Sequence, residues 1–336
     1  MMHQKSGTTQ DDRLVENPQE EDPVYALAAS PLFAEDGLCF AVRSSGLYRS
    51  DDRGITWHAA FEELDMEATP TATSVVFSPD FANDQMLFVG SLGGIFRSNE
   101  GGRIWEIVPL PSPPPLVSTM VISPNYMHDG TLCAGTFEDG VFCSADRGNH
   151  WVAWNFGLFD LNVLASAISP NFEVDKTLYV GVESGVFRST NGGRAWQEVG
   201  FDTNLAPVLS LAISPYYIED GTLLVGTETK GLWISDDRGN TWKSIGEKQI
   251  SGSVNEILIS SKGPSVPELL VHDDNGLLFS PDLGSTWRLL ESTTTVRGKI
   301  TCILALDGHN GIGQLLAGLD DGSVLRLPGP HAGTLS

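Results

Sequence analysis

The chain has 336 residues, and 43 Asp and Glu stand against 20 Lys and Arg, so its formal net charge is −23. Such acidity repels a phosphate backbone, and we therefore expect no nucleic-acid partner. No apolar run reaches the roughly 18 residues of a membrane-spanning helix, and residues 1–23 lack the pattern of a secretory signal. We expect no membrane span and a cytoplasmic location.

From residue 46 onward, one short pattern recurs six times. It reads GLYRSDDRGITW at 46–57, GIFRSNEGGRIW at 94–105, GVFCSADRGNHW at 140–151, GVFRSTNGGRAW at 185–196, GLWISDDRGNTW at 231–242 and GLLFSPDLGSTW at 276–287. Within each unit, four short strand-like runs are separated by turn residues, as in VLSLAIS, TLLVGT, GLWIS and TWKSIG of the fifth. No segment shows a convincing helical period.

Units of this length with four strands are typical of propeller blades. Six units begin near residues 24, 73, 117, 163, 208 and 254, and a seventh begins near 299 with only three strands. We predict an all-β, seven-bladed β-propeller of four-stranded antiparallel blades over residues 12–327. Its ring would be closed by an N-terminal strand at 12–16, which removes two open edges. Residues 1–11 and 328–336 would be tails, and six blades plus a stray hairpin is the weaker alternative.

The recurring S-x-D-x-G-x-T-W pattern resembles the Asp box, or BNR repeat. Its fixed positions are Ser50, Asp52, Gly54, Trp57, Ser98, Trp105, Ser144, Asp146, Trp151, Ser189, Trp196, Ser235, Asp237, Trp242, Ser280, Asp282 and Trp287. The repeat occurs in sialidases, xyloglucan-active glycosidases, sortilin-type receptors and a photosystem II assembly factor. In size and shortness of loops the chain is most similar to the assembly-factor type, which implies a non-enzymatic protein-interaction or assembly scaffold.

The box residues have a structural explanation that needs no ligand. The Asp carboxylate can accept backbone N–H groups in its own turn, and the Trp can pack between blades. A second periodic acid stands just before the second strand of five units, at Asp36, Asp84, Asp129, Asp175 and Asp220. Because a catalytic residue is normally used once, this recurrence also indicates turn chemistry.

The sequence carries no recognisable catalytic constellation. Sialidases need three arginines on the substrate carboxylate, whereas most arginines here stand at repeated positions, and Arg13, Arg43, Arg288, Arg297 and Arg326 are scattered. The seven His are dispersed, so we expect no metal, no cofactor and no catalytic residue. A glycan-active or glycan-binding propeller is the alternative, because glycosidases need only two suitably spaced carboxylates.

The four cysteines lie in apolar, strand-like runs without metal-ligand spacing. We interpret Cys39, Cys133, Cys143 and Cys302 as small buried hydrophobic residues. Cys133 and Cys143 flank one predicted hairpin and form the one pair that can face each other as a disulfide.

Propeller topology places the loops between second and third strands on one face, with the connections between blades. In units three to seven these loops carry Glu138, Asp139, Glu183, Glu228, Asp273, Asp274, Asp320 and Asp321. They form either an electronegative funnel for a protein partner with a basic segment, or ordinary solvated turns. Phe156, Phe159 and Phe201 stand in successive connections and form either an exposed contact surface or caps on the core.

Overall fold

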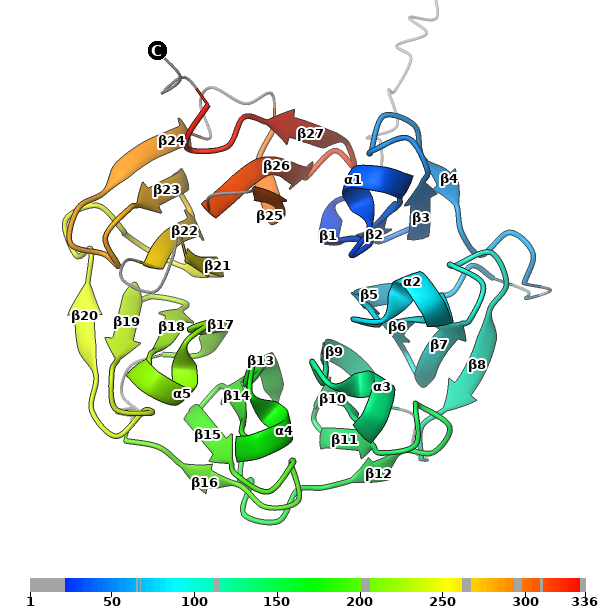
Figure 1. Cartoon of the computed structure of the whole chain (residues 1–336), viewed down its shortest axis with the longest axis horizontal. Coiled ribbons are helices and arrows are strands. Elements are labelled where there is room, and N and C mark those ends of the chain that lie inside the picture. Colours follow the sequence, from blue (N-terminus) through cyan, green and yellow to red (C-terminus); the bar gives the residue numbers. More distant parts are fainter. Residues whose placement is uncertain are drawn as a thin grey trace, which may run out of the picture.

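Seven antiparallel sheets form a ring around a central axis in this computed structural model (Figure 1). The structure describes residues 22–332, apart from 65, 67, 112–114, 201–205, 262–266, 293–297 and 309–310. The predicted seven-bladed β-propeller is therefore confirmed. The predicted closing strand at 12–16 lies outside the described residues. No helix of the described part is long and apolar enough to cross a membrane.

Each blade is a meander whose first strand lies innermost. Blade one consists of β1 (Val24–Ala29), β2 (Cys39–Arg43), β3 (Gly46–Ser50) and β4 (His58–Ala59). Blade two consists of β5 (Ala72–Phe77), β6 (Leu87–Ser91), β7 (Gly94–Ser98) and β8 (Glu106–Pro109). Blade three consists of β9 (Leu116–Ile122), β10 (Leu132–Phe137), β11 (Gly140–Ser144) and β12 (Val152–Ala153). Blade four consists of β13 (Val163–Ile168), β14 (Leu178–Val182), β15 (Gly185–Ser189) and β16 (Gln197–Glu198).

The remaining three blades follow the same order. Blade five consists of β17 (Val208–Ile213), β18 (Leu223–Thr227), β19 (Leu232–Ser235) and β20 (Lys243–Ile245). Blade six consists of β21 (Val254–Ser261), β22 (Pro267–Asp273), β23 (Gly276–Ser280) and β24 (Arg288–Ser292). Blade seven has three strands among the described residues, namely β25 (Ile300–Gly308), β26 (Gly311–Leu319) and β27 (Val324–Leu327).

Single-turn helices, which the sequence did not predict, join the first and second strands of blades one to five. They are α1 (Phe33–Asp36), α2 (Phe81–Asp84), α3 (Tyr126–Asp129), α4 (Phe172–Asp175) and α5 (Tyr217–Asp220). At four residues each, they are too short to produce a helical period. Each ends on the periodic Asp. In blade one, Asp36 accepts hydrogen bonds from the Ser30 hydroxyl at 2.7 Å and the Leu38 N–H at 2.9 Å.

The two faces of the ring differ. One carries the single-turn helices and the Asp-box turns, and Figure 1 is viewed from this helix face. The opposite face carries the loops between second and third strands and the connections between blades, and we call it the loop face. The apolar core is divided into clusters that lie between successive blades rather than within one sheet. Blade-to-blade packing therefore holds the ring together.

The seam between blades seven and one has the smallest described core cluster, with Val24, Ala41 and Cys302 buried in it. Polar contacts add to this seam. The Thr301 hydroxyl donates to the Val24 carbonyl at 2.6 Å, and the Arg326 guanidinium donates to the carbonyl of Arg53. The described blades therefore already close the ring.

The interpretation of all four cysteines as free buried residues holds for Cys39 and Cys302 and is wrong for the other two. Cys133 and Cys143 pair directly across the β10–β11 hairpin, with Cα atoms 4.1 Å apart, and form a disulfide. The short loop that follows the Thr136–Gly140 pair sets the register, which brings the two side chains to the same place on one face of the sheet. Both sulfurs belong to the cluster between blades three and four.

Candidate partner-binding face

The Asp-box turns occupy the helix face, and their polar atoms are used within the turn. In the first box, the Asp52 carboxylate accepts the N–H groups of Ile55 and Thr56 and the Thr56 hydroxyl. Ser50 donates its hydroxyl to Asp52 and accepts the N–H of Gly54 at 2.8 Å. Hydrogen bonds of the same kind surround Asp146, Asp237 and Asp282. These carboxylates fasten turns rather than converge on a ligand.

The hydrogen bonds lower the pKa of the box carboxylates. At Asp237, the hydroxyl and the N–H of Thr241, with a smaller contribution from the hydroxyl of Ser235, lower the pKa to about 2, and burial opposes this shift. Hydrogen bonds to the ionised form have this effect because they stabilise the charge. The box acids are therefore ionised at neutral pH, and none is held protonated as a general acid would be.

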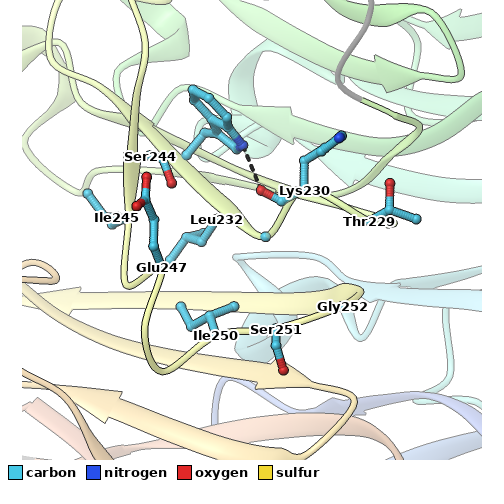
Figure 2. A pocket seen from close by; sticks show the side chains of 11 residues that line it. Thr229, Lys230, Leu232, Ser244, Ile245, Glu247, Ile250, Ser251 and Gly252 are labelled. Atoms are coloured by element: carbon cyan, nitrogen blue, oxygen red, sulfur yellow. Dashed lines mark hydrogen bonds between the residues drawn. The ribbon is translucent and has the colours of Figure 1, made fainter.

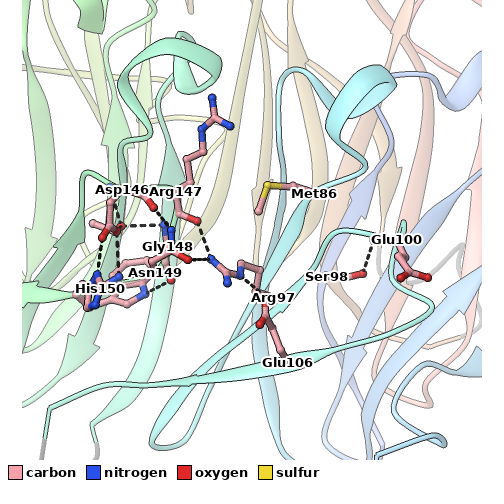
Figure 3. Close-up of polar contacts among 12 residues, drawn as sticks. Met86, Arg97, Ser98, Glu100, Glu106, Asp146, Arg147, Gly148, Asn149 and His150 are labelled. Carbon is pink, nitrogen blue, oxygen red and sulfur yellow. Dashed lines mark hydrogen bonds and ion pairs between the residues drawn. The ribbon is translucent and has the colours of Figure 1, made fainter.

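Arginines on third strands link the box turns of neighbouring blades. Arg97 on β7 donates from Nη1 to the Arg147 carbonyl at 3.2 Å and to Asn149 Oδ1 at 2.7 Å, as Figure 3 shows. Arg188 reaches the Arg238 carbonyl of blade five at 2.9 Å. Arg326, which the sequence analysis treats as scattered, occupies the same strand position in blade seven and contacts blade one. Blade seven lacks an Asp box, so the sequence gives no repeated motif against which Arg326 could be aligned with Arg97 and Arg188.

On the loop face, most of the predicted acids are exposed, and several are also bound to their own loops. Glu138, Glu183, Glu228, Asp274 and Asp321 are exposed, and Asp139 and Asp320 are half-buried. Asp273 is a correction, because it is fully buried and accepts the N–H groups of Asn275 and Gly276. It is a turn residue and cannot reach a partner. Three exposed lysines, Lys230, Lys248 and Lys299, lie in loops of the same face.

Beside these acids, the loop face is hollowed over blades one to three. The hollow has a volume of about 610 Å³ and is lined by Tyr25, Ser44, Thr71, Ala72, Thr73, Leu92, Leu116, Ser118 and Phe137. Three of its large side chains are exposed, with exposed fractions of 54% for Tyr25, 62% for Leu92 and 39% for Phe137. We call this site the apolar hollow. Sequence reasoning missed it, although Leu92 and Phe137 are apolar residues at positions where later blades have polar loops.

The aromatic residues of the third connection are also exposed. Phe156 and Phe159 are 81% and 87% exposed, whereas Leu158 between them is buried against the cluster of blades three and four. The alternative that both phenylalanines cap the core is therefore wrong, because Leu158 occupies that place. Phe201 lies outside the described residues. We call Phe156 and Phe159 the rim pair.

A second cavity lies between blades five and six, with a volume of about 330 Å³. Figure 2 shows Ser244, Ile245 and Glu247 on one stretch of its wall and Ile250, Ser251 and Gly252 on another. The indole N–H of Trp233 donates to the Lys230 carbonyl at 2.9 Å along its edge. This groove is more polar than the apolar hollow and holds a single carboxylate, that of Glu247.

The innermost strands enclose a central channel of about 350 Å³. It shares the side chains of Tyr25, Thr73 and Ser118 with the apolar hollow, which therefore lies at its mouth. Among the described residues that line the channel, Glu256 on β21 is the one carboxylate. No motif in the sequence marks Glu256. Aligning the first strands of the seven units would have found it, since the other six have a small residue there.

Comparison with known proteins identifies the class. The family model of the BNR-Asp box repeat matches residues 47–59 and 232–245. The chain is therefore a seven-bladed β-propeller that carries BNR-Asp box repeats. No curated protein sequence matches the chain significantly.

Several solved structures share the fold. A GH74 xyloglucanase from Xanthomonas campestris superposes with a TM-score of 0.72 and 17% identity over 92% of this chain, which spans 52% of that enzyme. The extracellular domain of a protein described as a one component system from B. thetaiotaomicron gives 0.67 and 18%, with 92% of this chain and 38% of that one covered. YCF48 bound to D1 peptide gives 0.65 and 18%, with 92% of both chains covered. YCF48 from Cyanidioschyzon merolae gives 0.64 and 15%, covering 92% and 96%.

Proposed function

We propose that this propeller is a non-enzymatic scaffold that binds an extended segment of a protein partner on its loop face. The observation that carries the proposal is the apolar hollow, where Tyr25, Leu92 and Phe137 are exposed together. Contiguous exposed apolar surface on a soluble domain is typical of an interaction site. The hollow is large enough for a bulky apolar side chain of the partner.

Charge defines the rest of the partner segment. Exposed acids continue around the same face from Glu138 through Glu183 and Glu228 to Asp274 and Asp321. They outnumber the exposed lysines Lys230, Lys248 and Lys299 there, so basic side chains on the bound segment would meet a favourable potential. The partner we propose therefore carries a large apolar residue next to a basic stretch. The similarity to YCF48, whose structure holds a bound D1 peptide, supports a propeller of this size as a peptide receptor.

The glycan-active alternative has less support. A glycosidase needs two carboxylates across one cleft, whereas the nine residues that line the apolar hollow include none. The box carboxylates are held by their own turns. The similarity to the xyloglucanase extends to the fold, and this chain spans about half of that enzyme.

The cellular compartment bears on the choice of partner. The cytoplasmic location expected from the sequence remains a proposal, and the Cys133–Cys143 disulfide weighs against it. Structural disulfides persist mainly in oxidising compartments.

Selection from a displayed library of random peptides tests the proposal. Wild-type protein and the matched variant Leu92→Ser with Phe137→Ser are used as parallel baits. We expect enriched peptides that combine a large apolar residue with Lys or Arg, bind the wild type in a salt-sensitive manner, and lose binding to the variant. Absence of enrichment, or peptides that bind both baits equally, would overturn the proposal.

A further inference from the structure

The central channel combines hydroxyl groups with one acid. The side chains of Thr73, Ser118, Thr119, Ser166, Ser210 and Thr301 line it, and Glu256 adds a carboxyl group. Several of the hydroxyls hold neighbouring blades together, as when Ser118 donates to the Val163 carbonyl at 2.6 Å and Ser210 to the Val254 carbonyl at 2.9 Å. These hydroxyl groups therefore have a structural role in joining blades, whereas joining blades does not require the negative charge of Glu256.

Glu256 breaks a pattern that the other blades keep. The equivalent residues of the inner strands are small: Ala26, Ser74, Thr119, Ala165, Ser210 and Cys302. In five blades a glycine stands opposite on the second strand, and a Cβ added there would collide with the next blade, as Gly181 would with Val208 at 2.3 Å. Blade six instead pairs Glu256 with His272. Repeat packing alone does not require an acid here.

The carboxyl group of Glu256 sits at the seam of blades six and seven. Its Oε2 accepts the N–H of Ile303 on β25 at 2.7 Å. One edge of β25 pairs with β26. The Ile303 N–H lies on the opposite edge of β25, which pairs with no described strand, and meets Glu256 of β21 there. No described salt bridge includes Glu256. Glu256 is half-buried. A carboxylate that is partly withdrawn from water and has no cationic partner is costly, and a cation that enters the channel would relieve that cost.

The titratable neighbours of Glu256 supply no positive charge. Burial lowers the pKa of His272, across on β22, so its imidazole is neutral near pH 7, and burial raises the pKa of the Cys302 thiol on β25. Lys299, Asp273 and Asp274 act on His272 rather than on Glu256. Burial raises the pKa of Glu256 itself to about 7, opposed by the hydrogen bond from Ile303.

The channel mouth gives access from the hollow. Tyr25, Thr73 and Ser118 line both spaces. Tyr25 and Thr73 each stand one residue after the start of an inner strand, and Ser118 stands two residues after the start of β9. Glu256 stands two residues after Val254, where β21 begins. A β-bulge lies between the two, so Glu256 is level with His272, one residue from the partner of Val254 on β22. This places Glu256 about 3–4 Å below the rim, a depth that an extended lysine side chain spans.

We propose that the channel receives a primary ammonium group, carried by a lysine of the bound partner segment, and that the Glu256 carboxylate pairs with it. The inference rests on the proposed function, because the peptide lying in the apolar hollow presents the lysine. An ammonium is a compact charge with three donors, which suits a channel walled by hydroxyl groups beside one carboxylate. The acids around the loop face raise the local concentration of cations at the mouth.

Nα-acetyl-lysine methylamide is the probe, titrated into the intact protein and followed by backbone amide NMR shifts of Ile303, whose N–H contacts the side chain at position 256, and of its neighbours on β25. We expect saturable binding, lost with the Nε-acetylated probe and at least about tenfold weaker in Glu256→Gln, because a charged hydrogen-bond partner is removed. Glu247→Gln, in the groove between blades five and six, is the matched control and should bind as the wild type does. The side-chain amide oxygen in the Glu256→Gln variant can still accept the Ile303 N–H, and a circular dichroism melt verifies folding.

Binding should also weaken as pH falls. The carboxylate is the competent form, and with a pKa of about 7 only about a tenth of it remains near pH 6 against about nine tenths near pH 8. Affinity should therefore drop about tenfold across that range.

The outcomes separate this inference from the proposed function. If the acetylated probe binds equally well, or Glu256→Gln binds the lysine probe undiminished, the inference is wrong. If either result is obtained while Leu92→Ser with Phe137→Ser still loses binding to the selected peptides, the inference fails and the proposed function is supported without it. If the lysine probe binds as predicted but no peptide depends on the hollow, the proposed function is wrong and the channel site stands.

Discussion

Arg97 of blade two holds the box turn of blade three. Its guanidinium reaches the Arg147 carbonyl at 3.2 Å and Asn149 Oδ1 at 2.7 Å, while Nε pairs with Glu106 of its own blade. Arg188 and Arg326 make the corresponding contact in blades four and seven. The Asp box is thus a point where one blade is fastened to the next as well as a local turn.

Arg97→Met should lower the free energy of unfolding by about 1–3 kcal/mol, because it removes charge-assisted hydrogen bonds but keeps the apolar stem. Urea denaturation followed by tryptophan fluorescence measures this. Arg103→Met, at an exposed arginine in the box turn of the same blade, is the control and should change stability by less than about 0.5 kcal/mol. Equal effects of the two substitutions would show that the contact between blades contributes nothing.

The box aspartates should make stability depend on acid pH. Asp237 has a pKa of about 2 against an ordinary value of 3.8. A lowered pKa in the folded state adds stability above the unfolded value, and this is lost as pH falls toward 2. Asp237→Asn should therefore be less stable than wild type at neutral pH, with a difference that narrows between about pH 5 and 2.

Thermal melts across that pH range test the prediction. Asp236→Asn is the matched control, since its carboxylate makes a surface contact with Lys243 at 3.2 Å, and such pairs contribute little. A gap between wild type and Asp237→Asn that stays constant down to about pH 2 would contradict the account.

Sequence predicted the architecture because the features that define a blade repeat. Spacing of the serines from Ser50 to Ser280 set the number of units, and turn residues separated the strands. The features that distinguish one blade from another were harder to foresee. Whether Asp273 faces solvent depends on its loop conformation, and the significance of Leu92, Phe137 and Glu256 depends on the ring bringing separate blades to one axis.

The Cys133–Cys143 disulfide should contribute measurably to stability. It closes a short loop with a sequence separation of 10, for which loss of chain entropy in the unfolded state predicts about 2–3 kcal/mol. Wild type should therefore melt at a lower temperature in dithiothreitol, whereas Cys133→Ala with Cys143→Ala should melt at the same temperature with and without reductant. An unreduced sample in which all the cysteines react as thiols after unfolding would contradict the disulfide.

The rim pair should be dispensable for folding. Phe156 and Phe159 are largely in solvent, so replacing both with Ser should change the free energy of unfolding by less than about 1 kcal/mol. Leu158→Ala, between them, should cost about 2–4 kcal/mol because it opens a cavity in a buried cluster. Chemical denaturation measures the stability of both variants. A larger loss in Phe156→Ser with Phe159→Ser than in Leu158→Ala would mean that the phenylalanines belong to the core.

The most direct measurement is the affinity of the tightest selected peptide, by fluorescence anisotropy, for three forms of the protein. The account predicts that Leu92→Ser with Phe137→Ser weakens binding by at least about tenfold, as expected for removal of buried anchors. Phe156→Ser with Phe159→Ser should leave the affinity within about twofold of wild type, given melting temperatures that match. Full affinity in the hollow variant, or loss of binding in the rim variant alone, would contradict the claim that partners dock in the apolar hollow.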